Sequence, residues 1–208
     1  MLPDMITYLD YFGTIVFAMT GCLVAARKQS DILAFILLGL LTAVGGGTLR
    51  DLLIGRTPVF WLIDEIYLLL TITTAVIMFI GLHHIERIRH YRSMLLWSDA
   101  VGISTFTIIG THIAVQSGIG FVPAILLGVS TACFGGILRD VLSNEITLIF
   151  RNDIYMTACI FGSIIYQIFY YFGYETLAVP MAFLACFSVR GLAIRYRLKL
   201  PGHNYFRN

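Results

Sequence analysis

An internal repeat constrains this chain more than any other feature of its sequence. Residues 10–61 align with residues 99–150 at a constant offset of 89, without a gap, and 17 of the 52 positions are identical. The strongest match is a Gly-Gly-x-Leu-Arg-Asp string that begins at Gly46 and again at Gly135. Apolar segments often match by chance, but such a string repeated in one register does not. We therefore interpret the two regions as copies of one structural unit.

The apolar runs indicate what each copy contains. Hydrophobic residues form 58% of the chain and charged residues 12%, which is too little polar surface for a soluble fold of this size. A run of about 20 apolar residues is long enough to cross a bilayer as a helix. The sequence predicts seven such spans, at 6–26, 32–53, 61–82, 94–116, 121–142, 154–172 and 177–194. We therefore predict an all-α membrane protein with seven transmembrane helices.

The offset between the copies also predicts their relative orientation. It covers three spans, and because three is odd the second copy enters the membrane from the opposite side. The prediction is a 3+3 inverted repeat plus a seventh helix, an architecture that recurs in proteins that move solutes along the repeat interface. The expected units are a first three-helix repeat at 5–82, an inverted repeat at 94–172, a seventh helix at 177–195 and a short basic tail at 196–208.

The placement of Lys and Arg predicts how the chain lies in the membrane. Eleven of the 14 basic residues fall in alternate linkers and the C-terminal tail, whereas only Arg50 and Arg56 fall on the other side. Cytoplasmic loops carry the excess of basic residues. We expect a multi-pass protein of the inner or plasma membrane, with the N-terminus outside and the C-terminus in the cytoplasm. The acidic N-terminus lacks the basic region of a cleavable signal peptide, so the first span is expected to remain.

Glycine clusters fall inside the second and fifth spans, at Gly45, Gly46 and Gly47 and again at Gly135 and Gly136. Because glycine in a helix interior costs about 0.5–1 kcal/mol, we expect a bend or local unwinding that exposes carbonyl oxygens to a cation pathway. Close helix packing by small residues is the alternative. The equivalent positions of the clusters in inverted halves favour the pathway. Leucine at Gly46 and Gly135 is then expected to alter flux and leave assembly intact.

Polar residues around the glycines are the candidate pore residues. The two Arg-Asp pairs are interpreted as ion pairs at the two mouths, or as anchors whose Arg side chains extend to the interface. Each hydroxyl can instead bond its own helix backbone, and a buried histidine is more often structural than a gate. The candidates are Arg50, Asp51, Arg139 and Asp140 at the mouths, Thr42 and Thr131 one turn before the glycines, and Ser104, Thr107, Thr111 and His112 on the polar fourth span.

Several functional classes lack support in the sequence. No protease, hydrolase or nucleotide-binding motif occurs, so we expect no enzyme and no catalytic residue. The four cysteines lie in apolar runs without metal-binding spacing, so we expect buried thiols, with no bound metal and no cofactor. A net charge of +2 gives no reason to expect nucleic acid as a partner. Arg190, inside the last span, is expected to pair with a carboxylate.

The doubled motif resembles that of a known family. The strings GGGTLRDLLIGRTPVFW and FGGILRDVLSNEITLIF, in a chain of about 200 residues, are similar to the bacterial branch of the trimeric intracellular cation (TRIC) channels. The same tandem domain is also labelled glycine-transporter-type. The resemblance implies a homotrimer in membrane lipid, with one potassium-permeable pore in each subunit and glycine-kinked helices 2 and 5 beside it. The permeant cation and a bound lipid are then the only expected ligands.

Two positions depart from the family pattern. Phe134 stands where the first copy has Gly45, and Thr147 where it has Pro58. The second break is therefore expected to be milder, and the turn after it less rigid. The basic lipid-binding motif of the animal branch is not found, so phosphoinositide dependence is not expected.

Two other functions remain open from the sequence. A secondary transporter of glycine or another small amino acid has the same architecture, because broken helices also hold a carboxylate and an amine. A structural membrane subunit accounts for the apolar composition but leaves the doubled motif unexplained.

Overall fold

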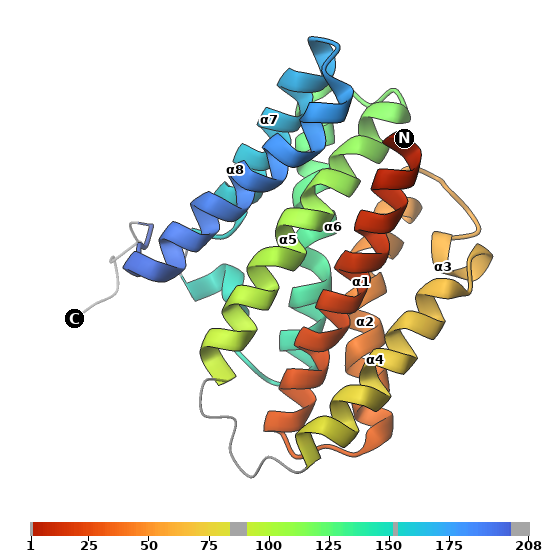
Figure 1. The fold of residues 1–208 in the computed structure, drawn as a ribbon, viewed down its shortest axis with the longest axis vertical. Helices are drawn as coiled ribbons and strands as arrows, with labels where there is room; N and C mark the ends of the chain where they lie inside the picture. Colours follow the sequence, from red (N-terminus) through yellow and green to blue (C-terminus); the bar gives the residue numbers. More distant parts are fainter. Residues whose placement is uncertain (1, 84–90, 152–153, 201–208) are drawn as a thin grey trace.

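The chain forms a bundle of helices (Figure 1). The computed structural model describes residues 2–83, 91–151 and 154–200, and these ranges contain helices and no β-strand. The elements are α1 (Leu2–Arg27), α2 (Ile32–Leu53), α3 (Phe60–Ile63), α4 (Ile66–His83), α5 (Tyr91–Gln116), α6 (Phe121–Leu142), the 3-10 helix η1 (Leu148–Arg151), α7 (Met156–Tyr171) and α8 (Glu175–Tyr196). The predicted all-α class is confirmed.

Five helices of the described ranges are long and apolar enough to cross a membrane, namely α1, α2, α5, α6 and α8. α4 and α7 are shorter apolar helices, and the 16 residues of α7 extend about 24 Å at 1.5 Å per residue. The third expected run is divided between α3 and α4, because the backbone leaves helical geometry at Asp64, with φ −111° and ψ 102°. Five of the seven predicted spans are thus confirmed by length and composition.

The molecule is apolar outside and charged inside. Large hydrophobic side chains are exposed along the bundle, among them Leu33 at 71%, Leu69 at 63% and Ile77 at 64%. The guanidinium groups of Arg50 and Arg139, in contrast, are on side chains that are 2% and 0% exposed. Water rarely tolerates so much exposed apolar surface, whereas lipid does. This arrangement is that of a multi-pass membrane protein.

Equivalent helices of the two copies meet at the centre of the bundle. α1 pairs with α2, α5 with α6, and α7 with α8, while α2 also packs against α6 and α1 against α5. Residues separated by the repeat offset share unusual backbone geometry. Gln29 and Gly118 both have positive φ, 54° and 73°, in the turns after α1 and α5, and Gly55 and Asn144 have φ 73° and 53° after α2 and α6. The copies in sequence are therefore copies in structure.

The repeated glycines bring α2 and α6 into contact backbone to backbone. A methyl group built on Gly46 would overlap the carbonyl oxygen of Thr131, and one built on Gly135 would overlap the carbonyl oxygen of Thr42. Because Thr42 and Thr131 are also separated by 89 residues, the contact is reciprocal and lies where the two halves cross. Small residues allow such an approach in membrane helices. Close packing therefore accounts for these two glycines.

The local unwinding expected at the glycines does not occur. α2 is continuous from Ile32 to Leu53 and α6 from Phe121 to Leu142, so the helical hydrogen bonds hold the carbonyls that the sequence analysis expects to be free. Even a Cβ atom would meet backbone at Gly46 and Gly135, which argues against the expectation that leucine there spares assembly. That expectation stays a prediction. A bend without unwinding, in either helix, stays a prediction.

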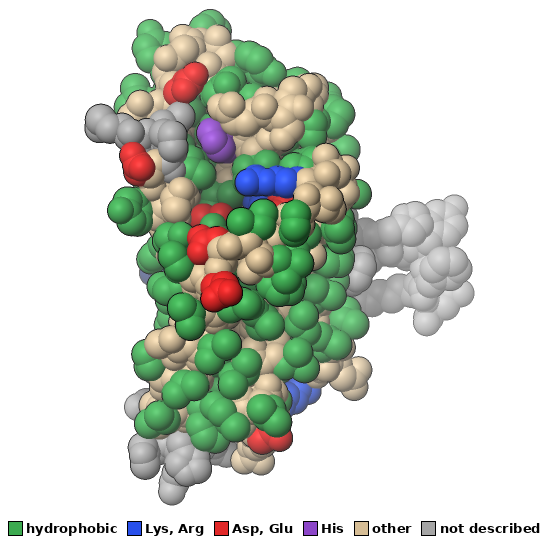
Figure 2. All heavy atoms as spheres, turned by 90° about the vertical axis from the view of Figure 1, so that its right-hand side faces the viewer, with side chains coloured by type: hydrophobic (Ala, Val, Ile, Leu, Met, Phe, Trp, Pro, Cys, Tyr) green, Lys and Arg blue, Asp and Glu red, His purple; other side chains and the backbone are tan. Residues whose placement is uncertain are grey.

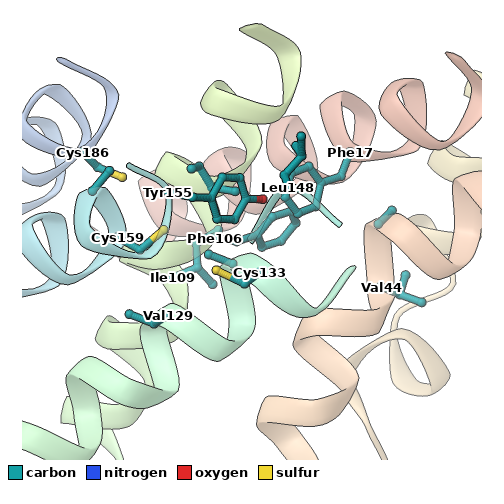
Figure 3. Packing of buried hydrophobic residues seen from close by; sticks show 14 of the residues in the cluster. Phe17, Val44, Phe106, Ile109, Val129, Cys133, Leu148, Tyr155, Cys159 and Cys186 are labelled. Carbon is teal, nitrogen blue, oxygen red and sulfur yellow. The ribbon is translucent and has the colours of Figure 1, made fainter. Parts of the chain in front are cut away.

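The main core lies beside this crossing and joins α7 and α8 to α5 and α6 (Figure 3). Aromatic rings of α1 and α5 pack there, with the Phe17 and Phe106 ring centroids 5.0 Å apart. Cys133, Cys159 and Cys186 belong to the same buried cluster, and Cys22 is buried in another. The four thiols thus pack as small hydrophobic groups, as expected from their positions in apolar runs.

Gly46→Ala and Gly135→Ala are expected to lower the free energy of unfolding by about 1–3 kcal/mol each, because the added methyl group forces the two backbones apart. Gly81→Ala is the matched control, since nothing lies within 4 Å of a Cβ at that helical position. Thermal unfolding of the purified variants in one detergent measures the difference. Equal melting temperatures for the three variants would contradict a tight crossing.

Candidate functional site

Each Arg-Asp pair of the repeated string forms a buried ion pair. Arg50 Nε donates to Asp51 Oδ1 at 2.8 Å, and Arg139 Nε donates to Asp140 Oδ1 at the same distance. The side chains of all four residues lie inside the protein. The two ion pairs are present, and the burial of both Arg side chains argues against anchors that extend to the interface. A place for these pairs at the mouths of a pathway stays a prediction. Removing charges from water is costly, and a close partner offsets part of that cost.

The second oxygen of each aspartate holds the chain that follows the helix. Asp51 Oδ2 accepts the backbone N–H of Phe60 at 3.0 Å, where α3 begins. Asp140 Oδ2 accepts the backbone N–H of Leu148 at 3.2 Å, where η1 begins. Each aspartate therefore neutralises its arginine and fixes the segment that returns over the end of the helix.

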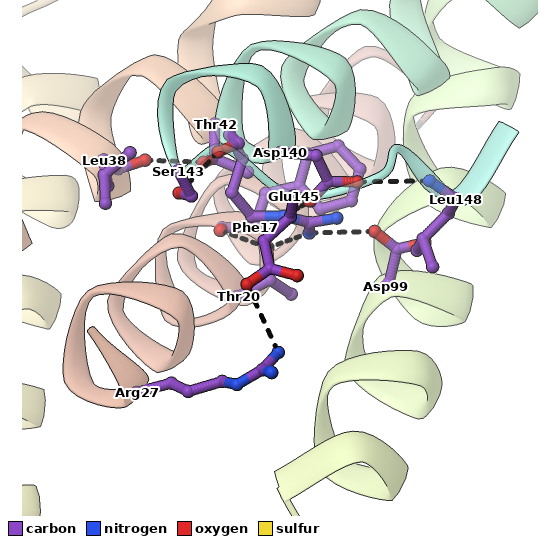
Figure 4. A network of polar contacts seen from close by, with 11 residues as sticks. Phe17, Thr20, Arg27, Leu38, Thr42, Asp99, Asp140, Ser143, Glu145 and Leu148 are labelled. Atoms are coloured by element: carbon purple, nitrogen blue, oxygen red, sulfur yellow. Dashed lines mark hydrogen bonds and ion pairs between the residues drawn. The ribbon is translucent and has the colours of Figure 1, made fainter. Parts of the chain in front are cut away.

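The second copy adds links to two further helices (Figure 4). Arg139 Nη1 donates to Asp99 Oδ1 on α5 and to Thr20 Oγ1 on α1, both at 3.0 Å. We refer to Arg139, Asp140, Asp99 and Thr20 as the Arg139 cluster. Arg139, Asp99 and Thr20 are fully buried, and Asp140 is 4% exposed. Charge-assisted hydrogen bonds of this length are the stronger ones in proteins, so the cluster ties α1, α5 and α6 together.

The first copy lacks the equivalent link. Asp10 is the repeat counterpart of Asp99, but its Oδ2 accepts the hydroxyl of Tyr67 at 2.9 Å. Its Oδ1 has no hydrogen-bond partner in the described part of the chain. The Arg50 guanidinium lies instead over the ring of Phe60, 5.4 Å from its centroid. The two ends therefore differ in their arginines: Arg139 bonds to α5 and α1, whereas Arg50 hydrogen-bonds only to the adjacent Asp51 among the described residues.

A cavity of about 500 Å³ lies at the end that holds Asp10 and Arg50, and we call it the vestibule. Side chains from both copies and from α8 line it. Figure 2 shows acidic, basic and histidine side chains around a recess, above a surface that is mostly hydrophobic. The polar residues of its wall are Thr7, Asp10, Arg50, Arg56, Tyr67, His112, Gln116 and Glu175. The vestibule is thus a polar recess in a bundle whose outer surface is mostly hydrophobic.

The candidate hydroxyls before the glycines bond within their own helices. Thr42 Oγ1 donates to the Leu38 carbonyl, and Thr131 Oγ1 donates to the Leu127 carbonyl at 2.7 Å. Both threonines are buried at the α2–α6 crossing. Their backbone carbonyls, rather than their hydroxyls, make the contact with the opposite glycines. A role of these hydroxyls in a pore stays a prediction.

The polar face of α5 divides between several neighbours. Ser104 Oγ donates to the Ala100 carbonyl at 2.7 Å, within α5. Thr111 lies 2.8 Å from Ser163 of α7, and His112 Nδ1 lies 2.6 Å from the hydroxyl of Tyr166. The wall-lining residue among the α5 candidates is therefore His112, which is half-buried beside the vestibule.

Thr107 is the remaining α5 candidate. It is fully buried, and its hydroxyl has no hydrogen-bond partner among the described residues. A pore-lining role for it and for the other α5 candidates stays a prediction.

Three residues that the structure brings to the site are not among the candidates predicted from the sequence. Asp10 and Asp99 open the aligned segments as an identical acidic pair, and this identity is a signal that points to them. Thr20 has no such signal, because its counterpart is Ile109. Its contact with Arg139 depends on how α1 and α6 are placed in space.

Comparison with known sequences identifies relatives over nearly the full chain. A family model described as glycine transporter matches residues 7–83 and 96–171. The inner membrane protein YadS of Escherichia coli K12, a UPF0126 protein, is 38% identical over 203 residues, which is 95% of each chain. A UPF0126 membrane protein of Vibrio cholerae is 38% identical over 194 residues, covering 93% of this chain and 80% of the relative.

Solved structures with the same fold are cation channels. The TRIC trimeric intracellular cation channel orthologue from Rhodobacter sphaeroides is 45% identical, with a TM-score of 0.88, over 93% of this chain and 99% of that chain. A prokaryotic TRIC channel in 0.5 M KCl is 30% identical, with a TM-score of 0.88, over 95% and 99%. These structural relatives are channels and not enzymes.

The repeat itself supplies a matched pair of variants for the Arg139 cluster. Arg139→Gln is expected to lower the free energy of unfolding by about 3–5 kcal/mol, because it leaves two buried carboxylates, Asp99 and Asp140, without their cation. Arg50→Gln leaves one such carboxylate, Asp51, and is expected to cost clearly less. Thermal unfolding in one detergent compares the two, and equal losses would contradict the difference between the two ends.

Proposed function

Because this chain belongs to the TRIC family of cation channels, we propose that it conducts monovalent cations, with potassium as the main permeant ion. The proposed assembly is a homotrimer in membrane lipid, with one pore in each subunit. The permeant ion is the only small ligand that this function requires, and neither a cofactor nor catalysis is part of it.

The observation that carries the proposal is the unequal state of the two ends of the inverted repeat. The vestibule opens at one end, and the Arg139 cluster joins α1, α5 and α6 at the other. A path between α1, α2, α5 and α6 would then lead from the vestibule, past the α2–α6 crossing, to the Arg139 cluster. In this reading the cluster is a closed gate at one mouth, and the Arg50–Asp51 pair stands at the other.

The charges of the vestibule are consistent with a cation as the permeant ion. Arg50 is neutralised by its ion pair with Asp51. Asp10 keeps one carboxylate oxygen without a partner among the described residues, and Glu175 adds a second acidic group to the wall, against Arg56. A carboxylate with a free oxygen in a site of low dielectric attracts a partly dehydrated cation.

The proposed orientation follows from where basic residues gather. Arg27 and Lys28, after α1, both pair with Glu145, after α6, at 3.5 and 3.0 Å. Linkers on the expected cytoplasmic side therefore lie at one end of the bundle, and that end is rich in Lys and Arg. We propose seven spans, with the N-terminus and the vestibule outside and the C-terminus inside. A bend at the glycines of α2 and α6, without unwinding, is part of the same proposal.

Reconstituted protein is expected to give potassium currents in planar bilayers, with a reversal potential that follows the potassium gradient. The matching experiment on glycine uptake into proteoliposomes is expected to show no saturable, gradient-driven accumulation. Silent bilayers across voltage and calcium, or coupled glycine uptake without current, would overturn the channel in favour of the transporter.

Thr20→Val is expected to raise the open probability about tenfold, because it removes the hydroxyl that accepts Arg139 Nη1 and so loosens α1 from the gate. A tenfold change corresponds to about 1.4 kcal/mol, which is near the lower end of the roughly 1.5–3 kcal/mol that a hydrogen bond to a charged group contributes. Single-channel recording measures it.

Thr14→Val is the matched control for Thr20→Val. It makes the same substitution at a buried position of α1, where the hydroxyl has no partner among the described residues. An unchanged open probability in Thr20→Val, or an equal rise in both variants, would contradict a gate at the Arg139 cluster.

A further inference from the structure

A second cavity, of about 550 Å³, lies between the start of α5 and the end of α8. We call it the basic pocket, because four of its eight described lining residues are cationic. These residues are Arg92, Arg190, Arg197 and Lys199, and the remainder of the described wall is Ser93, Leu96, Ala193 and Ile194. None of the described lining residues is acidic, so the positive charge of the pocket is not neutralised from within its wall.

Arg190 is the buried member of this set, with 1% of its surface exposed. Its Nη1 donates to the carbonyl oxygen of Ile154 at 3.0 Å, and its guanidinium lies 5.0 Å from the centroid of the Tyr155 ring. Nε and Nη2 have no hydrogen-bond partner among the described residues. The carboxylate partner expected from the sequence is absent from that part of the chain, where Arg190 forms no ion pair.

A buried guanidinium with two unused donors is costly unless an anion completes it. Arginine presents its N–H groups as a planar fork that matches the oxygens of phosphate or carboxylate. Three further cations, all exposed, line the same pocket and add positive charge to it. An anion with several oxygens, held by more than one cation, satisfies such a site better than a single carboxylate does.

We propose that the basic pocket binds a phosphate group, carried by an anionic lipid headgroup or free in solution. The pocket lies where a membrane helix ends, the depth at which lipid phosphates and basic side chains meet. The apolar part of its wall, from Leu96, Ala193 and Ile194, suits the start of an acyl chain. Either source of phosphate offers the same oxygens to Arg190.

The pocket also lies one aromatic ring away from the Arg139 cluster. Arg190 stacks on Tyr155, and the Tyr155 hydroxyl, Arg139 Nη2 and Asp99 Oδ1 all converge on Gly136, at 3.4, 3.6 and 3.7 Å from a Cβ built there. An anion on Arg190 therefore acts next to the residues that hold α5 and α6 together. Binding itself is the inference, and it does not depend on the protein being a channel.

Native mass spectrometry of the purified protein with added phosphatidylglycerol or phosphatidylcholine tests the lipid source. The triple variant Arg92→Gln, Arg197→Gln, Lys199→Gln removes the exposed cations of the pocket and leaves the buried Arg190 in place. The matched control is Arg27→Gln, Lys28→Gln, Arg195→Gln, which removes three exposed cations outside the pocket wall. The wild type and the control are expected to retain phosphatidylglycerol in preference to phosphatidylcholine. In the pocket variant the ratio of bound phosphatidylglycerol to bound phosphatidylcholine is expected to fall at least fivefold.

Inorganic phosphate tests the free source, through the melting temperature in lipid-free detergent at constant ionic strength. A rise in the wild type and the control, but not in the pocket variant, supports phosphate without lipid. Selective loss of phosphatidylglycerol alone supports the headgroup. The proposal is overturned if the pocket variant retains lipid and responds to phosphate as the control does. Because neither measurement uses current, a silent channel leaves this result unaffected.

Discussion

The contact between α2 and α6 at Gly46 and Gly135 is the constraint on which the rest of the structure depends. Each glycine meets a carbonyl of the opposite helix, so the two copies cross where no side chain separates them. The Arg-Asp pairs follow the glycines by four and five residues, on helices that run in opposite directions through the bundle. One buried ion pair therefore lies on each side of the crossing, toward opposite ends of the bundle.

Buried charge is the second constraint on this structure. The arginines inside the bundle differ in how many hydrogen-bond, ion-pair and aromatic partners they have. Arg139 has an adjacent carboxylate, a second carboxylate and a hydroxyl. Arg50 has one carboxylate and an aromatic ring, and Arg190 has one carbonyl and a ring. Arg190 and Asp10 each have polar atoms without a hydrogen-bond partner among the described residues. Each of them also lines a cavity. An unpaired charge inside an apolar bundle is costly in free energy, so an ion of opposite sign that binds beside either group offsets that cost.

Much of the fold follows from the sequence, while the site follows only in part. The Arg-Asp ion pairs are predictable, because adjacent opposite charges in a span have no cheaper partner. The glycines are misread as breaks, because local cost favours unwinding and only the neighbouring helix supplies the compensating contact. Thr42 and Thr131 are chosen for their hydroxyls, whereas their carbonyls make the crossing. The contact of Thr20 with Arg139 cannot be predicted from the sequence, because it depends on α6 lying near α1.

Residue order and hydrophobic pattern are enough for the membrane class and the repeat, because both depend on local chemistry and on counting spans. They leave the two ends of the molecule equal, since Asp10, Arg50 and Asp51 match Asp99, Arg139 and Asp140 one for one. Tertiary structure makes the ends differ. Tyr67 bonds Asp10, and the Arg50 guanidinium lies over the ring of Phe60. Asp10 and Arg50 are therefore not joined as Asp99 and Arg139 are. At the other end Arg139 reaches Asp99 and Thr20.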